Sequence, residues 1–238
     1  MAAGTLVIGA SQAGLQLAVS LREAGDTDPI TLVGAEPHAP YQRPPLSKAY
    51  LHGNAELEQL WLRTPEFLAG QGITLVTGER VETVDLYAGG PPGTARTAGG
   101  RVLDFDRLAL TVGARPRRLT VPGANLDGVR YLRTADEATA LRELQSDAEA
   151  VVVIGGGFIG LEAAAVARTQ GKSVTVVEAA DRLIGRAVAP VVSDFYRDAH
   201  VRRGVDVAWA LRWFRSAAST TGCARFSCPM AAGSQRTW

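Results

Sequence analysis

Cysteine is scarce in this sequence: there are two in 238 residues, Cys223 and Cys228, and both lie near the C-terminal end. A framework of disulfide bonds needs several cysteines spread along the chain, and a cysteine-ligated metal cluster needs them at metal-binding spacing. Neither kind of structure is therefore expected to organise the protein, and we expect no metal site.

Long apolar runs and a strong charge of either sign are also missing. The first apolar run, Thr5–Ile8, is too short to span a membrane or to form the core of a signal peptide. The formal net charge is +1, which gives no reason to expect a nucleic-acid or membrane partner. With 46% apolar and 21% charged residues, the composition is that of an ordinary globular protein, which we expect in the cytoplasm.

A strand–turn–helix–strand pattern opens the sequence. The short apolar run Thr5–Ile8 predicts a buried strand, and the turn Gly9–Gly14 follows it. Apolar residues at three-to-four spacing over residues 15–25 then predict a helix, which a glycine ends. The run Ile30–Val33 predicts the second strand, and Glu36 lies just beyond it.

The same pattern recurs in the second half of the sequence. Val151–Ile154 predicts a strand, Gly155–Gly160 a turn and Leu161–Thr169 an alanine-rich helix. Ser173–Val177 predicts the next strand, and Glu178 ends it. Two distant copies of one βαβ unit indicate an α/β protein with two Rossmann-like dinucleotide-binding domains.

Glycines in these turns have separate tasks. The first allows a tight turn, the second lets the backbone approach a pyrophosphate, and the third lets the helix pack on the strand. The pyrophosphate then faces free N–H groups and the positive end of the helix dipole. The second turn has Gly155, Gly157 and Gly160, whereas the first has Ser11 between Gly9 and Gly14. The alternative is a glycine-rich turn without a ligand.

Two carboxylates follow the second strands of these units. Glu178 is expected to accept hydrogen bonds from the ribose hydroxyls of a nicotinamide coenzyme. A 2′-phosphate would face this carboxylate at a cost of about 1–4 kcal/mol, which predicts NADH over NADPH unless Arg182 or Arg186 shelters the phosphate. Glu36 is expected to play the same part in the first unit, the alternative being a solvated loop carboxylate.

Between the two βαβ units, the sequence predicts several shorter elements. Apolar runs predict β-structure within Ile73–Val76, Arg80–Leu86 and Val102–Val112. The stretch Gly89–Gly100 is rich in Gly, Pro and Thr, which favours a flexible hairpin loop. Helical periodicity over Thr134–Leu144 leads toward the second unit.

The last residues differ from the rest. No Asp, Glu or Lys follows Asp206, and Trp209, Trp213, Phe214 and Phe226 show no sustained strand or helix period. We interpret 208–238 as an aberrant tail, with a frameshift as the leading explanation and a genuine docking segment as the alternative.

The segment Gly34–Lys48, GAEPHAPYQRPPLSK, resembles the ferredoxin reductase family, the FAD-dependent pyridine nucleotide oxidoreductases that serve bacterial cytochrome P450 and aromatic-ring dioxygenase systems. The similarity continues through Leu62–Pro65, Tyr131–Thr134, Gly155–Glu162 and Ala189–Val207. Members of this family are considerably longer, so the resemblance implies a glutathione-reductase-like fold that is incomplete at the C-terminus.

This resemblance implies three regions: an FAD-binding domain at 1–117, an NAD-binding domain at 118–207 and the tail at 208–238. It implies an NADH-dependent ferredoxin reductase that passes electrons from NADH through FAD to a 2Fe-2S ferredoxin. The alternative is an inactive, truncated nucleotide-binding fragment of such a reductase. A disulfide or peroxide reductase is a poor alternative, because no cysteine lies in the region after Glu36 that would face the flavin.

The resemblance also implies site residues. Those implied at FAD are Gly9, Ser11, Ala13, Gly14, Glu36, Arg43, Pro45, Lys48, Val81 and Arg133. Those expected at NADH are Gly155, Gly157, Ile159, Gly160, Glu178 and Arg186. The segment Thr111–Gly113 departs from the family's Ala-Thr-Gly, which is expected to weaken adenosine contacts.

Two charged residues are the implied catalytic residues. Lys48 is expected near the flavin N5, and Glu162 is expected to pair with it beside the nicotinamide, since a lone buried charge would cost several kcal/mol. The alternative for Glu162 is a solvent-facing helix residue. Arg63 is implied as a contact for an acidic ferredoxin, with an ordinary surface arginine as the alternative.

Overall fold

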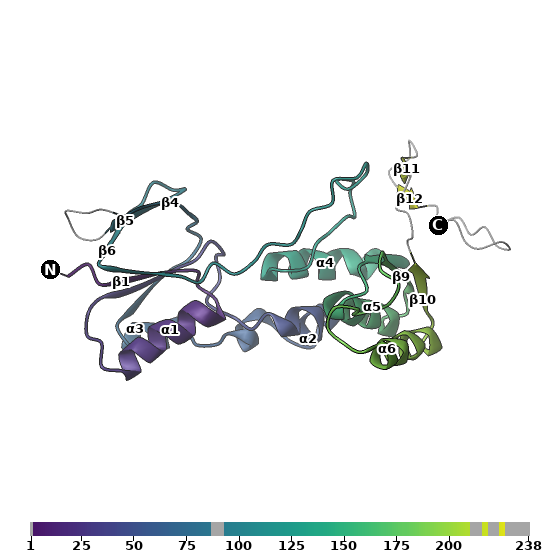
Figure 1. Cartoon of the computed structure of the whole chain (residues 1–238), viewed down its shortest axis with the longest axis horizontal. Coiled ribbons are helices and arrows are strands. Elements are labelled where there is room, and N and C mark those ends of the chain that lie inside the picture. The colour runs from purple at the N-terminus through teal and green to yellow at the C-terminus, as the bar shows by residue number, and fades with distance from the viewer. Residues whose placement is uncertain (1, 87–92, 210–215, 219–223, 227–238) are drawn as a thin grey trace. The chain divides into compact units, whose positions relative to one another are not determined.

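A computed structural model describes residues 2–86, 93–209, 216–218 and 224–226 (Figure 1). The chain divides into two compact units, each described by itself below. Unit 1 comprises residues 1–43 and 56–115, and unit 2 comprises residues 44–55 and 116–238. The sequence-based boundaries placed residues 44–55 in the first domain, whereas these residues pack with unit 2.

Unit 1 is built on a parallel sheet of the order β3-β2-β1-β7. Its strands are β1 (Thr5–Ile8), β2 (Ile30–Val33), β3 (Ile73–Val76) and β7 (Arg107–Leu110). Helix α1 (Gln12–Glu23) connects β1 to β2, which pair in register from Thr5 with Ile30 to Ile8 with Val33. The predicted βαβ unit is therefore present with the predicted strand bounds.

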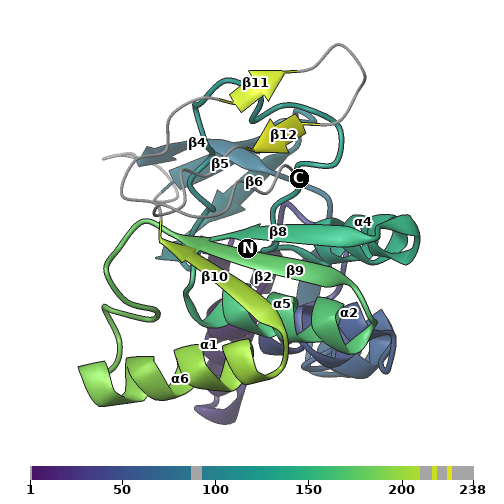
Figure 2. The same ribbon diagram turned by 90° about the vertical axis from the view of Figure 1, so that its right-hand side faces the viewer.

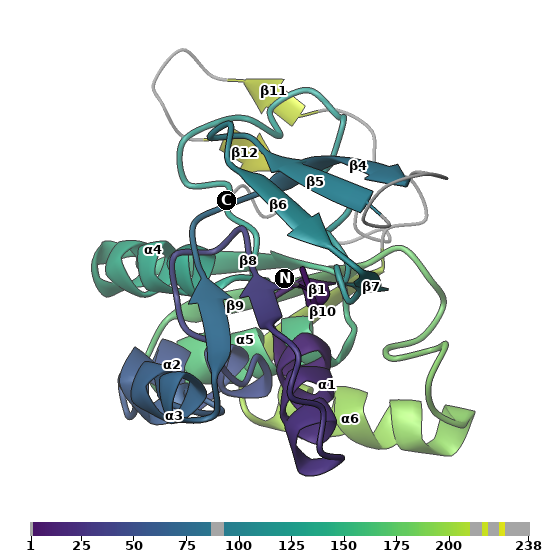
Figure 3. The ribbon, with the colours of Figure 1, turned by 90° about the vertical axis from the view of Figure 1, so that its left-hand side faces the viewer.

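Both faces of this sheet are covered, which explains why β1 is apolar throughout. Val7 packs on one face with Leu15 of α1 and with Leu68 of α3 (Pro65–Gly70). Leu6 and Ile8 point to the opposite face, where Phe105 belongs to the same buried cluster. Figure 3 shows the helices on one side of the sheet and a second, antiparallel sheet on the other. Each fully buried side chain of this size stabilises the fold by roughly 1.5–3 kcal/mol.

The antiparallel sheet has the order β4-β5-β6 and consists of β4 (Val81–Leu86), β5 (Gly93–Thr97) and β6 (Val102–Phe105). The prediction of a flexible loop over Gly89–Gly100 is therefore wrong for residues 93–97, which form the central strand. Gly93 is required there, because a Cβ at this position would lie 2.4 Å from Cζ of Phe105. Residues 87–92 lie outside the described part.

The predicted run Val102–Val112 is divided between the two sheets of unit 1. Asp106 separates β6 from β7, and its Oδ2 accepts a hydrogen bond of 2.7 Å from the backbone N–H of Gly4. The backbone N–H of Asp106 in turn donates to the carbonyl of Gly4. These two bonds fix the corner at which the chain leaves one sheet and enters the other. The remaining short element of unit 1 is the 3-10 helix η2 (Leu57–Leu60).

Unit 2 repeats the parallel βαβ architecture with the sheet order β10-β9-β8. Its strands are β8 (Ala150–Ile154), β9 (Ser173–Glu178) and β10 (Val205–Trp209), connected by α5 (Phe158–Thr169) and α6 (Pro190–Arg202). Both connecting helices lie on the same face of the sheet, as right-handed crossovers require (Figure 2). Leu161 and Ala164 of α5 pack there against Val174 and Val176 of β9.

Helix α4 (Ala135–Asp147) precedes this sheet and begins with a reciprocal capping box. The hydroxyl of Thr134 accepts from the N–H of Glu137, and the carboxylate of Glu137 accepts from the N–H of Thr134, each at 3.2 Å. The predicted helix over Thr134–Leu144 is thus present, but it begins one residue later and ends three residues later.

The segment of residues 44–55 contributes the 3-10 helix η1 (Pro44–Ser47) and the short helix α2 (Ala49–His52) to unit 2. Tyr50 anchors it, since its buried ring lies 4.9 Å from the guanidinium of Arg142 and its hydroxyl hydrogen-bonds Thr139 at 2.6 Å. A proline-rich stretch within the first half of the sequence thereby becomes part of the second unit.

The expected tail boundary at residue 208 is wrong for Ala208 and Trp209. Both belong to β10 and pair with Val177 and Glu178 of β9, and Trp209 packs against the core of unit 2. Of the later residues, only β11 (Ser216–Ala218) and β12 (Ala224–Phe226) are described, and they pair in antiparallel fashion. Trp213 and Phe214 lie outside the described residues.

The longest helices of the described part, α4 and α6, contain 13 residues each. A bilayer-spanning helix needs about 20 apolar residues, and none of the described helices meets that requirement.

Candidate dinucleotide-binding sites

The turn after β1 is closed by contacts that only glycine permits. Gly9 has a φ of +118°, and a Cβ on it would lie 2.2 Å from the carbonyl oxygen of Thr111. A Cβ on Gly14 would lie 2.2 Å from the carbonyl oxygen of Gly9. The two glycines therefore hold α1 directly against the end of β1, as predicted for a dinucleotide-binding turn.

Ser11 is the N-cap residue of α1, but its side chain makes no capping hydrogen bond. The first N–H groups of a helix have no partners inside the helix. Ala13 and Gly14 lie in this first turn. The N-terminus of α1 thus retains backbone donors and the positive end of the helix dipole for an anion.

Thr111 follows β7 and ties it to this turn. Its N–H donates to the carbonyl of Ile8 at 2.8 Å, and its hydroxyl lies 2.9 Å from the carbonyl of Gly9. From the sequence alone, this position was only part of a departure from a family pattern. The structure gives it a local role, because it satisfies carbonyls where β1 ends.

The turn after β8 uses three consecutive glycines in different ways. Gly155 has a φ of +108°, which disfavours other residues. A Cβ on Gly156 would lie 2.3 Å from Cδ2 of Leu183, whereas a Cβ on Gly157 would meet no atom within 4 Å. A Cβ on Gly160 would lie 2.0 Å from the carbonyl oxygen of Gly155. The space beside Gly157 is therefore open, and the other three glycines maintain the turn.

Gly156 was not predicted as a site residue, yet it links the turn to the segment after β9. Its N–H donates to Oε2 of Glu178 at 2.7 Å, and its carbonyl accepts from the N–H of Ile184 at 2.9 Å. The other oxygen of Glu178, Oε1, accepts from the N–H of Ala180 at 2.8 Å. Two backbone donors thus fix the carboxylate of Glu178, and each oxygen keeps a lone pair for a further donor.

Arg182 is engaged within the same segment. Its guanidinium donates to the carbonyls of Gly185 at 2.5 Å and Val188 at 2.7 Å. Arg186, in contrast, is exposed. Of the two arginines that could accompany a 2′-phosphate, Arg182 therefore already has acceptors in its own loop.

Glu36 lies in the loop after β2 and is bound by two side chains. Oε1 forms an ion pair of 2.5 Å with Arg43, and Oε2 accepts a hydrogen bond of 2.5 Å from the hydroxyl of Tyr41. Glu36 is therefore held by two side chains, and its role at a ribose stays a prediction. Tyr41 was missed in the sequence, although it lies in the same specific motif as Arg43.

Lys48 and Glu162 form the expected ion pair, with 2.8 Å between Nζ and Oε2. The side chain of Glu162 is 28% exposed and that of Lys48 is 52% exposed. The hydroxyl of Ser47 donates to the same Oε2 at 2.5 Å. Glu162 is therefore paired and only partly exposed, and Ser47 is a partner that was not identified from the sequence. All three residues belong to unit 2.

The other predicted residues take individual positions. Pro45 lies in η1, where its carbonyl accepts from the N–H of Lys48, and Val81 begins β4. Arg133 directly precedes the capping residue of α4, and Ile159 is 49% exposed in the first turn of α5. Arg63 stacks on Phe67 with 5.3 Å between guanidinium carbon and ring centre.

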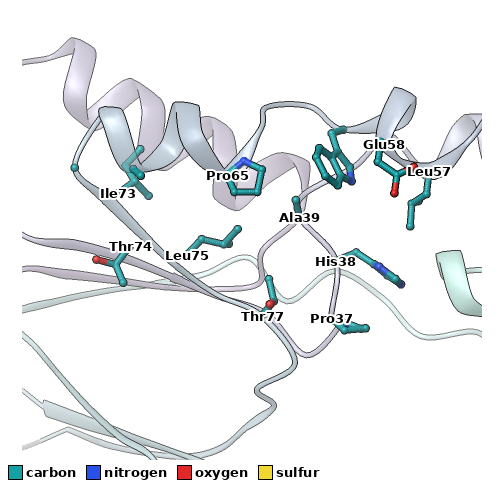
Figure 4. Close-up of a pocket in the computed structure, with 13 residues that line it drawn as sticks. Pro37, His38, Ala39, Leu57, Glu58, Pro65, Ile73, Thr74, Leu75 and Thr77 are labelled. Atoms are coloured by element: carbon teal, nitrogen blue, oxygen red, sulfur yellow. The ribbon is translucent and has the colours of Figure 1, made fainter.

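A cavity of about 720 Å³ lies along the open edge of β3 in unit 1. Its walls include His38 and Ala39, Glu58 of η2, Pro65 of α3, and Leu75 and Thr77 (Figure 4). Trp61 also lines it, and the indole N–H of Trp61 is buried without a hydrogen-bond partner. None of the predicted site residues lines this cavity, so it is separate from the proposed dinucleotide sites.

Within the part of the chain that the structure describes, two titratable groups have shifted pKa values. Burial, and secondarily the nearby Arg203, lower the pKa of His200 on α6. A backbone hydrogen bond, and secondarily one with Thr64, lower the pKa of the exposed Glu66 at the start of α3. Neither lies in the two turns. Among the described residues no group of three or more His, Cys, Asp or Glu side chains could hold a metal ion.

Comparison with known proteins decides the family. The family model described as pyridine nucleotide-disulphide oxidoreductase matches residues 4–213. The chain belongs to this family. The predicted family resemblance and the α/β fold class with parallel sheets are thereby confirmed. Members of the pyridine nucleotide-disulphide oxidoreductases use FAD and NAD(H).

Similar members of the family include several bacterial reductases. The chain is 50% identical over 200 residues to rhodocoxin reductase of Rhodococcus erythropolis, covering 84% of this chain and 46% of that protein. It is 40% identical over 205 residues to putidaredoxin reductase of Pseudomonas putida, covering 85% and 48%. The chain therefore spans about half the length of the curated relatives it matches.

Solved structures agree with this family assignment. The ferredoxin reductase for the CYP199A2 system from Rhodopseudomonas palustris has a TM-score of 0.84 at 41% identity, over 92% of this chain and 56% of that chain. Putidaredoxin reductase in its covalent complex with putidaredoxin has a TM-score of 0.82 at 38% identity, over 92% and 52%.

Proposed function

We propose that the chain forms the nucleotide-binding part of an FAD-dependent NADH:ferredoxin oxidoreductase. The observation that carries the proposal is the repeated junction of strand, glycine turn and helix, present once in each unit. A carboxylate follows the second strand of each βαβ unit, at Glu36 and at Glu178. The family includes several kinds of oxidoreductase, and the similarity to ferredoxin reductases supports this activity over the others.

FAD is the proposed ligand of unit 1. The uncapped N-terminus of α1, with Gly9, Ser11, Ala13 and Gly14, suits the diphosphate of a dinucleotide. Glu36 would accept from the adenosine ribose with the lone pairs that Tyr41 and Arg43 leave available. Arg43 and Val81 are further proposed FAD contacts in this unit. Pro45, Lys48 and Arg133, which the family resemblance also implies at FAD, belong to unit 2.

NADH is the proposed ligand of unit 2. Open space around Gly157 suits a diphosphate at the N-terminus of α5, with Gly155, Ile159 and Gly160 in the same turn. Glu178 already points its carboxylate at the backbone of this turn, which suits a ribose with two free hydroxyls. Arg186 is the proposed cationic contact beyond it.

Lys48 and Glu162 are the proposed catalytic residues. FAD, when bound, converts a two-electron donor into a source of single electrons. The chain itself has to bind and orient the coenzymes and exclude water. Lys48 places a positive charge beside Glu162, which lies one turn into α5. The pair would orient the reactive end of the nicotinamide coenzyme and keep the charge of Glu162 balanced.

A 2Fe-2S ferredoxin in the cytoplasm, serving a cytochrome P450 or a ring-hydroxylating dioxygenase, is the proposed electron acceptor. The name of one similar structure, the complex of putidaredoxin reductase with putidaredoxin, supports a partner of this kind. Arg63, on the surface of unit 1 next to Phe67, is the proposed contact with its acidic surface.

Anaerobic reduction of the flavin tests this activity. The purified chain, incubated with FAD, should retain the flavin absorbance, and NADH should bleach it until oxidised ferredoxin is added. Lys48→Ala should slow the bleaching by about tenfold or more, because it removes a charge preorganised at the reacting end. Lys172→Ala in the same unit is the matched control and should behave as wild type.

The alternative, a chain that binds nucleotides without catalysing electron transfer, is favoured by the coverage of about half of each relative. It makes a different prediction in the same experiment. NADH would then bind, but the flavin absorbance would be absent or would remain unbleached.

A further inference from the structure

The hydroxyl of Ser47 is directed at a carboxylate within unit 2. Ser47 ends η1, is 4% exposed, and lies with Oγ 2.5 Å from Oε2 of Glu162. The carbonyl of Pro44 lies 3.4 Å from the same Oγ. A hydroxyl has a single proton, and the short contact with a charged acceptor is the stronger of the two. Ser47 therefore donates to Glu162.

The two donors to Oε2 of Glu162 differ in how firmly they are held. Lys48 has a side chain that is 52% exposed, and its ammonium group also donates to the carbonyl of Pro44 at 3.2 Å. An exposed lysine keeps much of its rotamer freedom, and solvent screens its charge. The hydroxyl of Ser47 is attached by a short, buried side chain to a 3-10 turn. Ser47 is thus the more rigid of the two donors.

Both donors use the same oxygen of Glu162. Within the described part of the chain, no hydrogen bond is made to the other oxygen, Oε1. Since Oε2 receives a neutral and a charged donor together, the carboxylate is held in one orientation with Oε1 available. An available carboxylate oxygen is an acceptor for a ligand group that donates hydrogen bonds, such as a carboxamide.

We infer that Ser47 is a positioning residue that orients Glu162 so that Oε1 can accept a hydrogen bond from the carboxamide of the nicotinamide ring. The inference rests on the proposed binding of NADH by unit 2. It assigns two different tasks to neighbouring residues: Lys48 supplies charge, and Ser47 supplies orientation. Replacing the hydroxyl leaves the charge pair intact but allows the carboxylate to rotate.

Comparing the binding of two ligands distinguishes a positioning role of Ser47 from a purely structural role. ADP-ribose contains the adenosine, both phosphates and both riboses of NADH but lacks the nicotinamide ring. The affinity of the full chain for each ligand is measured by titration calorimetry. Ser47→Ala should weaken the affinity for NADH by about fivefold, which is less than the tenfold that corresponds to about 1.4 kcal/mol. The affinity for ADP-ribose should not change. Ser47→Thr retains the hydroxyl and should restore most of the NADH affinity.

Two further variants complete the test. Ser146→Ala, at an exposed serine of α4 in the same unit, is the matched control and should bind both ligands as wild type does. In a Glu162→Gln background, Ser47→Ala should cause no further loss of NADH affinity, because the oriented charge is already absent. An equal loss for NADH and ADP-ribose, an unchanged NADH affinity, or an additive loss in the Glu162→Gln background would overturn the inference. Wild-type protein that binds neither ligand would instead overturn the proposed function on which the inference rests.

Discussion

Glu178 illustrates how a side chain can be fixed before a ligand binds. The backbone N–H groups of Gly156 and Ala180 hold one carboxylate oxygen each, so the negative charge has a defined position beside the glycine turn. Because the position is fixed by the backbone, the carboxylate cannot easily rotate away from a second negative charge. Preference for a ribose with a free 2′-hydroxyl should follow from this fixed charge.

Glu178→Gln should reduce the preference for NADH over NADPH by about tenfold, because the substitution removes a repulsion of about 1–4 kcal/mol while one amide oxygen still accepts from the backbone. The measurement is the ratio of the dissociation constants of the two coenzymes. Asp181→Asn, an exposed acid in the same loop, is the control. An unchanged ratio in Glu178→Gln would refute this role of Glu178.

His200 should make the stability of unit 2 depend on pH. Burial, and secondarily Arg203, lower its pKa in the folded protein, so the unfolded chain binds the proton more readily. Stability should therefore fall as the pH decreases below about 6.5, the ordinary histidine value, toward the lower pKa of the folded state.

Thermal unfolding followed between about pH 7.5 and about pH 5.5 measures this effect. His200→Gln should lose less stability over this range than wild type. Arg203→Gln should give an intermediate result, because it removes only the smaller cause. Identical pH profiles for all three proteins would contradict the assignment.

Residues within one motif were easier to predict than their partners. The pairing of Lys48 with Glu162 was expected and is confirmed. Ser47 and Tyr41 were not identified, because a serine or tyrosine has no sequence signal that reveals which carboxylate it will contact. Gly156 was missed for a related reason: its neighbour, Leu183, lies in a loop whose conformation the sequence does not define.

At the scale of the elements, the two glycine turns combine tight packing with open space. Gly160 and Gly14 bring each helix against its strand, and no larger residue fits at either position. A Cβ on Gly157 would meet no atom within 4 Å, so packing does not require glycine there, and we propose that a ligand occupies the space. Two glycines of one turn should therefore respond differently to the same substitution.

Gly160→Ala should destabilise unit 2 by about 1–3 kcal/mol, because its Cβ would lie 2.0 Å from the carbonyl oxygen of Gly155. Gly157→Ala should leave the stability near that of wild type but weaken NADH binding, because the new methyl group enters the space proposed for the diphosphate. Chemical denaturation and calorimetric titration measure the two effects separately. A Gly157→Ala variant that binds NADH normally would show that the diphosphate lies elsewhere.

Strands were predicted well where apolar runs were continuous and poorly where they were not. The strands of both βαβ units were found from their continuous apolar runs rich in β-branched residues. Strand β5 was taken for a loop because Gly93–Thr97 is rich in small and polar residues, and its burial depends on Phe105 packing over Gly93. Trp209 was assigned to the tail, because its place in β10 depends on pairing with Glu178 of β9, which is distant in sequence.

At the scale of the molecule, the chain forms two units that each contain a parallel βαβ sheet. Neither unit is one continuous stretch of the sequence. Residues 44–55 lie between parts of unit 1 in sequence but belong to unit 2, where Tyr50 anchors them. This brings Ser47 and Lys48 to Glu162 within one unit. The assignment of residues 44–55 to unit 2 was not predictable from local sequence patterns, since it depends on packing between residues far apart in sequence.

From the repeated architecture we propose two separate dinucleotide sites, one in each unit. Titration calorimetry of the full chain with FAD, then with NADH in the presence of saturating FAD, tests this most directly. The account predicts one FAD and one NADH bound per chain, with an NADH affinity that FAD does not abolish. Competition of the two coenzymes for a single site, or binding of neither, would contradict it.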